Sequence, residues 1–380
     1  MAGQPECSSG KSIGLYIHVP FCDGKCPYCD FFSLRGNSSM MDDYTECIIN
    51  NLKSSSEQTA RKADSLYLGG GTPSLLGGRR TARIVEAARK YFGLEGAEIA
   101  VEANPGSGLA EFFREAAAAG VNRVSLGLQS ADGDELRLLG RRHTADDAAR
   151  AVEAARNAGI GSISLDLMLA VQGQTEESLR HSIEFCASCG VQHVSAYLLK
   201  VEPHTLYWKE RASLRLPDED TSAALYLEAV RLLAAHGYRQ YEISNFAKPG
   251  FESRHNLKYW HCEEYLGLGP SAHSFLSGRR FHYASSLRGY LAGDGPVQDG
   301  TGGDFDEFSM LRLRLAEGLT DRVCRARFGY AVPEKISRAA ERYEPAGLIQ
   351  CFPGGFRFTP RGFLVSNALT AEVLFPSPAS

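Results

Sequence analysis

Short apolar runs alternate with amphipathic stretches along the first half of the chain. The apolar runs predict strands over residues 14–19, 65–70, 98–103, 123–129, 162–169 and 193–199, because each is rich in β-favouring residues and bounded by polar residues or glycine. The stretches between them predict helices over residues 42–60, 79–92, 109–119, 144–158 and 175–188. Six strand–helix units in succession indicate a parallel sheet with helices outside it. Because eight units of a complete barrel need about 250 residues, we predict an α/β fold with an open, partial (β/α)6 barrel.

The pattern changes after residue 200. A helix is predicted over residues 219–236, followed by a polar-aromatic run (253–265) and a glycine-rich run (267–275). The segment "LAGDGPVQDGTGGD" (291–304) predicts a linker. We therefore expect four parts: a flexible amino terminus (1–12), the barrel with its extension (13–290), the linker, and a small helical, winged-helix-like carboxyl-terminal domain (305–380) with a hairpin around Pro353, Gly354 and Gly355.

Composition narrows the class of protein. The chain has 380 residues, of which 43% are hydrophobic and 23% charged, and a net charge of −4. These values are typical of a globular protein, and the lack of basic excess argues against a nucleic-acid binder. The first residues contain no apolar signal core, and no run reaches roughly 18 apolar residues. We expect a cytoplasmic protein without stable membrane insertion, in which the ten cysteines do not form a disulfide framework.

Three cysteines stand close together. Cys22, Cys26 and Cys29 directly follow the first predicted strand with the spacing C-x-x-x-C-x-x-C. A structural zinc site usually has four protein ligands, one more than this cluster supplies. A catalytic thiol requires only one cysteine. An iron–sulfur cluster normally takes four thiolates, so three would leave one iron open to a small molecule. The spacing leaves these alternatives open. The C-x-x-C pair Cys186 and Cys189 lies near the end of a predicted helix, where buried or incidental thiols are expected.

Polar residues also end the next predicted strands. The second is followed by "GGGTPS" (69–74), the third ends in "VEANPG" (101–106), the fourth in "LGLQS" (126–130), and the fifth carries Asp166. In parallel barrels the carboxyl ends of the strands form the active site. Each residue alone is explained by turn chemistry, but these four strand ends and the cysteines after the first strand together predict a site for a polar ligand.

The cysteine spacing after a first strand, Tyr28 before the last cysteine and "GGGTP" after the second strand resemble the radical S-adenosylmethionine (SAM) superfamily. "GVNRVSLGLQS", "LGRRHT", "YEISNFAKPG" and "HNLKYW" narrow the resemblance to the oxygen-independent coproporphyrinogen III oxidase-like group. Members that make protoporphyrinogen carry another Cys where this chain has Phe31. Phe31 and the H-N-x-x-Y-W run from His255 to Trp260 resemble the HemW branch of heme chaperones.

The resemblance implies three cofactors. A 4Fe-4S cluster would be held by Cys22, Cys26 and Cys29, and the methionine part of SAM would chelate the fourth iron. SAM contacts would fall to the following residues: Tyr16, Tyr28, Gly70, Gly71, Thr72, Glu102, Gln129, Arg141 and Asp166. Heme iron would be bound by His255, with His261 and His273 as competing candidates. The implied partners are heme, an acceptor hemoprotein and an electron donor.

Two alternatives and two departures accompany this interpretation. The alternatives are a radical oxidase that decarboxylates coproporphyrinogen III and a radical heme-degrading enzyme. Phe31 argues against the oxidase but leaves heme degradation open.

Two segments depart from the family pattern. Where the family commonly has G-L-P after the fifth strand, this chain has "LAVQGQ" (169–174), and where the family has G-C-G-A-H, this chain has "GPSAH" (269–273). We expect these changes to alter the loop beside Asp166 and the porphyrin side of the pocket.

Overall fold

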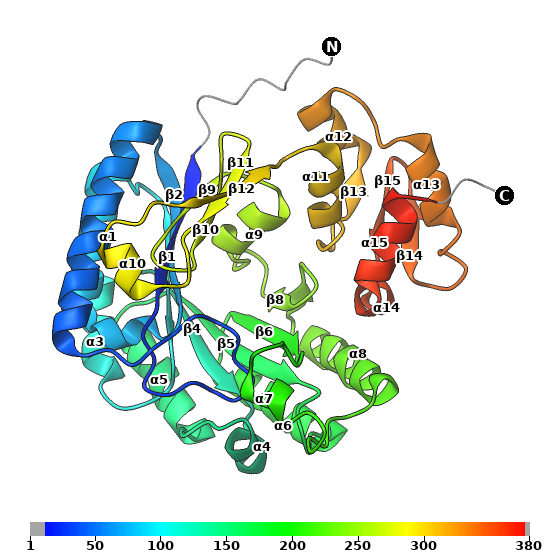
Figure 1. Cartoon of the computed structure of the whole chain (residues 1–380). Helices are drawn as coiled ribbons and strands as arrows, with labels where there is room; N and C mark the ends of the chain where they lie inside the picture. The colour runs from blue at the N-terminus through cyan, green and yellow to red at the C-terminus, as the bar shows by residue number, and fades with distance from the viewer. Residues whose placement is uncertain (1–11, 377–380) are drawn as a thin grey trace.

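A mixed sheet of twelve strands dominates the computed structural model, which describes residues 12–376 (Figure 1). Its strands are β1 (Ile13–Val19), β2 (Ala63–Gly70), β3 (Glu98–Ala103), β4 (Arg123–Gln129), β5 (Ser162–Leu169), β6 (His193–Leu198), β7 (Arg239–Gln240), β8 (Asn245–Ala247), β9 (Tyr265–Leu268), β10 (His273–Leu276), β11 (Arg279–His282) and β12 (Val297–Thr301). They lie in the order β12-β11-β10-β9-β1-β2-β3-β4-β5-β6-β8-β7, which leaves β12 and β7 as edges. This open arrangement is compatible with a partial barrel.

The six strands predicted first form the parallel centre of the sheet, and the helices between them lie along its outside (Figure 1). These helices are α1 (Ser38–Thr59), α2 (Gly78–Phe92), α3 (Leu109–Ala118), α5 (Ala145–Asn157) and α6 (Glu176–Ser188). The prediction missed the short helix α4 (Gly133–Leu138), which begins at the N-cap Asp132. It also missed that β9 pairs in parallel with β1 and extends the sheet on that side.

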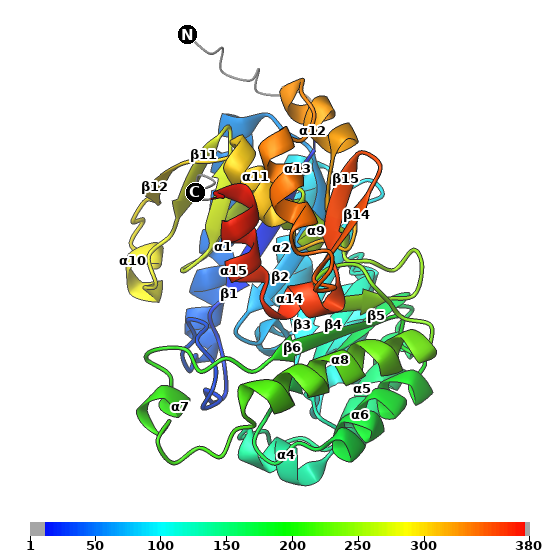
Figure 2. The ribbon, with the colours of Figure 1, turned by 90° about the vertical axis from the view of Figure 1, so that its right-hand side faces the viewer.

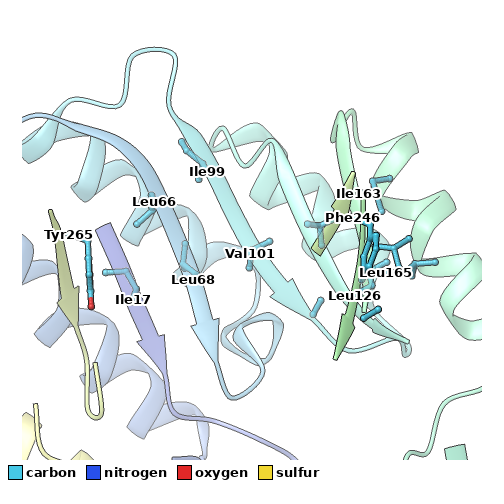
Figure 3. Packing of buried hydrophobic residues seen from close by; sticks show 14 of the residues in the cluster. Ile17, Leu66, Leu68, Ile99, Val101, Leu126, Ile163, Leu165, Phe246 and Tyr265 are labelled. Carbon is cyan, nitrogen blue, oxygen red and sulfur yellow. The ribbon is translucent and has the colours of Figure 1, made fainter. Parts of the chain in front are cut away.

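The two faces of the parallel strands differ. Side chains such as Ile17, Leu66, Leu68 and Val101 are fully buried and belong to one apolar core (Figure 3). Burying each leucine contributes about 1.5–3 kcal/mol, and this is the main force that holds the helices on the sheet. Because side chains alternate along a strand, the residues between them face the other side. That face carries polar groups, and it leads to the candidate site.

The second half of the chain adds to both ends of this core. It contains α7 (Leu206–Lys209), α8 (Glu219–Ala235), α9 (Arg254–Trp260), α10 (Leu287–Leu291), α11 (Phe305–Arg312), α12 (Asp321–Phe328), α13 (Glu334–Glu341), α14 (Pro360–Leu364) and α15 (Ser366–Leu374). The segment 291–304, expected as a linker, contains the edge strand β12. Its apolar content is low, and the pairing with β11 that orders it lies outside the reach of local sequence patterns.

The carboxyl-terminal helices pack beside a small sheet of β13 (Leu319–Thr320), β15 (Gly355–Phe358) and β14 (Ile349–Phe352). Figure 2 shows the β14–β15 hairpin at the edge of these helices. The predicted hairpin is confirmed, with Pro353 and Gly354 between β14 and β15. The flexible amino terminus predicted over residues 1–12 lies, apart from Ser12, outside the described residues. Across residues 12–376, no helix combines the length and apolar character needed to cross a membrane.

Candidate functional site

The three clustered cysteines lie in the loop that follows β1. Two backbone hydrogen bonds join the ends of the loop: the Cys22 N–H donates to the Leu34 carbonyl (3.0 Å), and the Leu34 N–H donates to the Pro20 carbonyl (2.8 Å). Within the loop, the Cys29 N–H donates to the Cys26 carbonyl (3.1 Å). All three thiols are free and half-buried. The sequence thus places three unpaired sulfurs on one braced loop at the carboxyl end of the sheet.

Side chains from two later loops reach two of these sulfurs. The Asn104 amide donates to the Thr72 hydroxyl (2.9 Å), so the hydroxyl proton is free to point at the Cys22 sulfur 3.3 Å away. Arg141 approaches the Cys26 sulfur at 3.5 Å and also donates to the Asn104 side chain (2.6 Å). Hydrogen-bond donors and a cation can stabilise the negative charge of a sulfur that binds a metal. The arrangement therefore suits sulfurs that bind a metal.

The "GGGTP" turn after β2 is joined to the cysteine loop. The Gly71 N–H donates to the Val19 carbonyl (2.8 Å) and the Thr72 N–H to the Phe21 carbonyl (2.7 Å). A Cβ on Gly71 would lie 2.6 Å from the Phe21 carbonyl oxygen, too close for any side chain. Gly70 has a φ of +106°, which glycine adopts without strain. The chain's own packing thus requires these glycines, independently of any ligand.

Two carboxyl groups lie on the polar face of the sheet. The Tyr67 hydroxyl and the Gly70 N–H donate to the Glu102 carboxylate at 2.8 and 3.1 Å. Burial, together with the nearby Asp166, raises the pKa of Glu102 to about 7. Burial also raises the pKa of Asp166, which accepts a hydrogen bond from Ser125 (2.8 Å). Such carboxyl groups accept hydrogen bonds from hydroxyl groups of a polar ligand.

Tyr16 connects this face to the cysteine loop through a histidine. The His18 Nε2 lies 2.9 Å from the Phe32 carbonyl, so this nitrogen carries the proton, and Nδ1 accepts from the Tyr16 hydroxyl (3.1 Å). Tyr28, on the loop itself, packs against Tyr207 of α7 with a ring-centroid distance of 6.3 Å. Burial raises the pKa of both Tyr16 and Tyr28. Both phenols are therefore neutral hydrogen-bonding groups at neutral pH.

Two further predicted residues lie at neighbouring strand ends. Gln129 ends β4 with a φ of +70°, where the pairing with β5 shifts register. Arg141 lies between α4 and α5, and it also donates to the Gly127 carbonyl (2.8 Å). A reciprocal capping box between Thr144 and Asp147 fixes the start of α5 just beyond Arg141. Local sequence thus fixes the position from which the guanidinium reaches the cysteine loop.

His255, the expected heme ligand, packs against two residues of this group: its ring stacks on that of Tyr67 (centroids 5.3 Å apart) and lies 6.5 Å from that of Tyr16. His255 lies on α9, and its backbone N–H donates to Glu98 at the start of β3 (3.0 Å). Its Nδ1 pairs with Ser65 (2.9 Å) and its Nε2 with Tyr259 (2.8 Å). The residue is 1% exposed, and burial lowers its pKa to about 3. In this conformation neither ring nitrogen is open to an iron atom.

Comparison with known proteins identifies the family of this chain. The family model for the radical SAM superfamily matches residues 16–186. A heme chaperone HemW of Bacillus subtilis (strain 168) is 33% identical over 94% of this chain and 98% of its own length. The heme chaperone HemW of Escherichia coli (strain K12) is 38% identical over 80% of this chain and 83% of its own. The chain belongs to the heme chaperone HemW family.

One solved structure shares the fold over most of the chain. Coproporphyrinogen III oxidase (HemN) from Escherichia coli, a radical SAM enzyme, has a TM-score of 0.81 over 95% of this chain and 89% of that chain. At 20% sequence identity the likeness concerns the fold alone. It confirms the predicted α/β radical SAM fold.

Membership of the radical SAM superfamily implies a 4Fe-4S cluster and SAM, and the cysteine loop fits the cluster. In a tetrahedral zinc site with Zn–S bonds near 2.3 Å, the sulfurs lie about 3.8 Å apart. Among the described residues, one group places three potential ligand atoms within 4.8 Å of one another, and it does not include these cysteines. Sulfurs spread more widely suit three separate irons of a cluster better than a single zinc ion.

The two segments that depart from the family pattern, 169–174 and 269–273, are held by contacts within the chain. In the loop beside Asp166, Ala170 has a φ of +57°, and its N–H donates to the buried Gln174 side chain (2.7 Å). In "GPSAH", Gly269 packs so closely on β1 that a Cβ would lie 2.5 Å from the His18 carbonyl oxygen. Both loops are therefore ordered by contacts with their own chain.

Sequence reasoning missed two residues of the site. Asn104 joins Thr72 to Arg141, and its place in the "EANPG" strand end was the available signal. His18 was missed because a histidine inside an apolar strand gives no sign of its partners. Its contact with the Phe32 carbonyl depends on the path of the cysteine loop.

Proposed function

We propose that this chain carries a 4Fe-4S cluster on Cys22, Cys26 and Cys29, binds SAM beside it, and transfers heme to an acceptor hemoprotein. Relatives named heme chaperone HemW, matched over 80% or more of both chains, are the observation that carries the proposal. An electron donor for the cluster belongs to the same proposal. The bound cluster and SAM would supply one-electron chemistry, while the residues around them bind and orient the cofactor.

The SAM residues follow from the strand-end geometry. Arg141 offers the cation that pairs with the methionine carboxylate, and the Glu102 and Asp166 carboxyl groups would accept hydrogen bonds from the ribose hydroxyls. Of the remaining predicted contacts, Gly70, Gly71, Thr72 and Gln129 lie at or just after strand ends, Tyr28 lies on the cysteine loop, and Tyr16 lies in the middle of β1. This assignment uses every polar strand end from β1 to β5.

For heme, we move the iron ligand from His255 to His261. The side chain of His261 is 31% exposed, and burial lowers its pKa, which keeps the imidazole neutral. The neighbouring Trp260 has a buried indole N–H without a hydrogen-bond partner among the described residues. A neutral imidazole is a common heme ligand, and an aromatic face suits a porphyrin. Trp260 is the last residue of the H-N-x-x-Y-W motif, and His261 directly follows it.

Heme titration of anaerobically reconstituted protein tests the proposal. Wild type should bind heme with a shifted Soret band, and His261→Ala should weaken this shift. His181→Ala is the matched control, because His181 is exposed on α6, far along the chain from α9. A shift lost in His255→Ala but kept in His261→Ala would return the ligand to His255 and require α9 to open. Absence of a heme-induced shift in wild type would overturn heme carriage.

The same preparation separates the chaperone from the enzymes. Phe31, at the position of the oxidases' additional Cys, is 63% exposed on the cysteine loop. With reductant and SAM, we expect no protoporphyrinogen from coproporphyrinogen III and recovery of added heme intact. Turnover of coproporphyrinogen would restore the oxidase, and SAM-dependent loss of heme would indicate a degrading enzyme.

A further inference from the structure

His273, His282 and Asp299 meet on the strands at the β12 edge of the large sheet. The His282 Nδ1 lies 2.8 Å from one Asp299 oxygen, and the His273 Nδ1 lies 4.0 Å from the other. The two imidazole rings stack with centroids 5.0 Å apart. Among the described residues, these three supply the group of potential metal ligands whose atoms all lie within 4.8 Å of one another.

The backbone holds the three side chains together. His273 on β10 is directly opposite His282 on β11, so both project from the same face of the sheet. Between β11 and β12 the register shifts: Phe281 pairs with Gln298 and Arg280 with Gly300. Asp299 is therefore the extra residue of a β-bulge, a feature that commonly redirects a side chain. Each of three adjacent strands thus supplies one ligand.

We propose that His273, His282 and Asp299 form a binding site for a divalent transition-metal ion of the Zn²⁺ type. Two imidazoles and one carboxylate are a ligand set typical of zinc with one position open, and ligand atoms around such an ion lie about 3.3 Å apart. The distances of 2.8 and 4.0 Å bracket that value. The side chains are 66%, 30% and 35% exposed, respectively, so an ion can enter from solvent.

Heme iron is a poorer occupant of this group. Heme iron has one axial position on each face of the porphyrin, so it could bind only one of these two imidazoles, which stack side by side with an interplanar angle of 23°. The nearby cation Arg280 forms an ion pair with Glu307 and lies over the Phe275 ring. These contacts partly neutralise the charge of its guanidinium group, which would otherwise disfavour a cation at this site. A small ion that accepts three ligands from one side matches the geometry.

The site has a structural consequence for β12. Every residue of this strand is exposed, so apolar burial does not hold it, and its ladder with β11 is its principal attachment. An ion shared by β10, β11 and β12 would cross-link the edge. Edge strands are usually protected in some way because they offer unpaired backbone groups.

Zinc uptake by cluster-reconstituted protein tests this site. The protein is dialysed against micromolar Zn²⁺, and zinc and iron are counted together by elemental analysis. Wild type and the control His181→Ala should hold one zinc per chain. His282→Ala and Asp299→Asn should bind zinc at least about 10–100-fold more weakly, since loss of even an outer contact to a metal ligand costs this much. The iron count should be equal in all four proteins.

Each contrary outcome is distinct. Zinc bound equally by wild type and His282→Ala would assign the ion to other residues, such as cluster-free cysteines, and overturn the proposal. Wild type without zinc would overturn it as well. Asp299→Asn keeps the size of the side chain, so it remains informative if His282→Ala is unstable, and the iron count reports whether each variant is folded. Neither result depends on heme binding, so the chaperone proposal is tested separately.

Discussion

At the residue scale, the cysteine sulfurs differ in what surrounds them. Cys22 lies beside the Thr72 hydroxyl, Cys26 lies beside Arg141, and Cys29 is half-buried on the same loop. Cys186, in the C-x-x-C pair on α6, is completely buried in the apolar core, and burial raises its pKa well above the usual value. A thiol without donors or solvent binds metal poorly, because the thiolate is the ligand.

This contrast predicts which cysteines the cluster needs. Cys22→Ala should lose most of the iron, the sulfide and the broad visible absorption after anaerobic reconstitution, because one of three thiolates is missing. Cys186→Ala should keep the iron, the sulfide and the absorption, although this substitution leaves a small cavity in the core. If Cys186→Ala also lost the cluster while remaining folded, the C-x-x-C pair would have to be counted among the ligands.

The histidine of the H-N-x-x-Y-W motif shows why some residues could not be placed from sequence. The motif pointed to His255 as a ligand, but the partner of its Nδ1, Ser65, lies 190 positions away. Strand ends are different: the carboxyl ends of parallel strands meet by topology alone. Cys22, Thr72 and Glu102 could therefore be grouped before their contacts were known.

At the element scale, the turn after β2 and the cysteine loop form one unit. Gly71→Ala places a methyl group against the Phe21 and Val19 carbonyl oxygens, 2.6 and 2.9 Å away. We expect this variant to lose the cluster as well as any response to SAM, since the clash displaces the chain next to Cys22. Gly106→Ala is the control, because a Cβ there meets no atom within 4 Å.

Iron content and the electron paramagnetic signal with and without SAM measure the difference. Wild type and Gly106→Ala should retain both the iron and the SAM-induced change. A Gly71→Ala protein with full iron but no response to SAM would show instead that the turn acts on the cofactor alone. Full iron and a normal response would contradict the packing argument.

Elements were predictable where their pattern is local. β1 to β6 and five of the helices between them follow from apolar runs and periodicity, with bounds within a few residues. The strands β9 to β12 have four or five residues each, and β12 is wholly exposed, so no burial pattern marks it. The order of these strands depends on pairing between distant segments, and local sequence patterns specify such pairing only weakly.

At the scale of the whole molecule, the carboxyl-terminal region is tied to the large sheet beside β8. Ile243 N–H donates to the Arg314 carbonyl (3.0 Å), Ala316 N–H donates to the Tyr241 carbonyl (3.0 Å), and Glu242 and Leu315 form a β-bridge. Glu242 is completely buried in this junction. Burial raises its pKa from 4.5 to about 7, so the junction contains a carboxyl group that resists ionisation.

This group makes the stability of the molecule depend on pH. Because its pKa is higher in the folded than in the unfolded chain, the folded state binds more protons between pH 4.5 and about 7, and stability falls as pH rises through this range. Glu242→Gln removes the effect, so the difference in unfolding free energy between pH 5 and pH 8 should shrink by up to about 3 kcal/mol. Urea unfolding at the two pH values measures this change.

The control is Glu57→Gln, at an exposed position on α1, which should leave the difference unchanged. The contribution of Glu102 is common to all three proteins. If Glu242→Gln kept the wild-type pH dependence, or became less stable at pH 8 than wild type, the junction would need the ionised carboxylate.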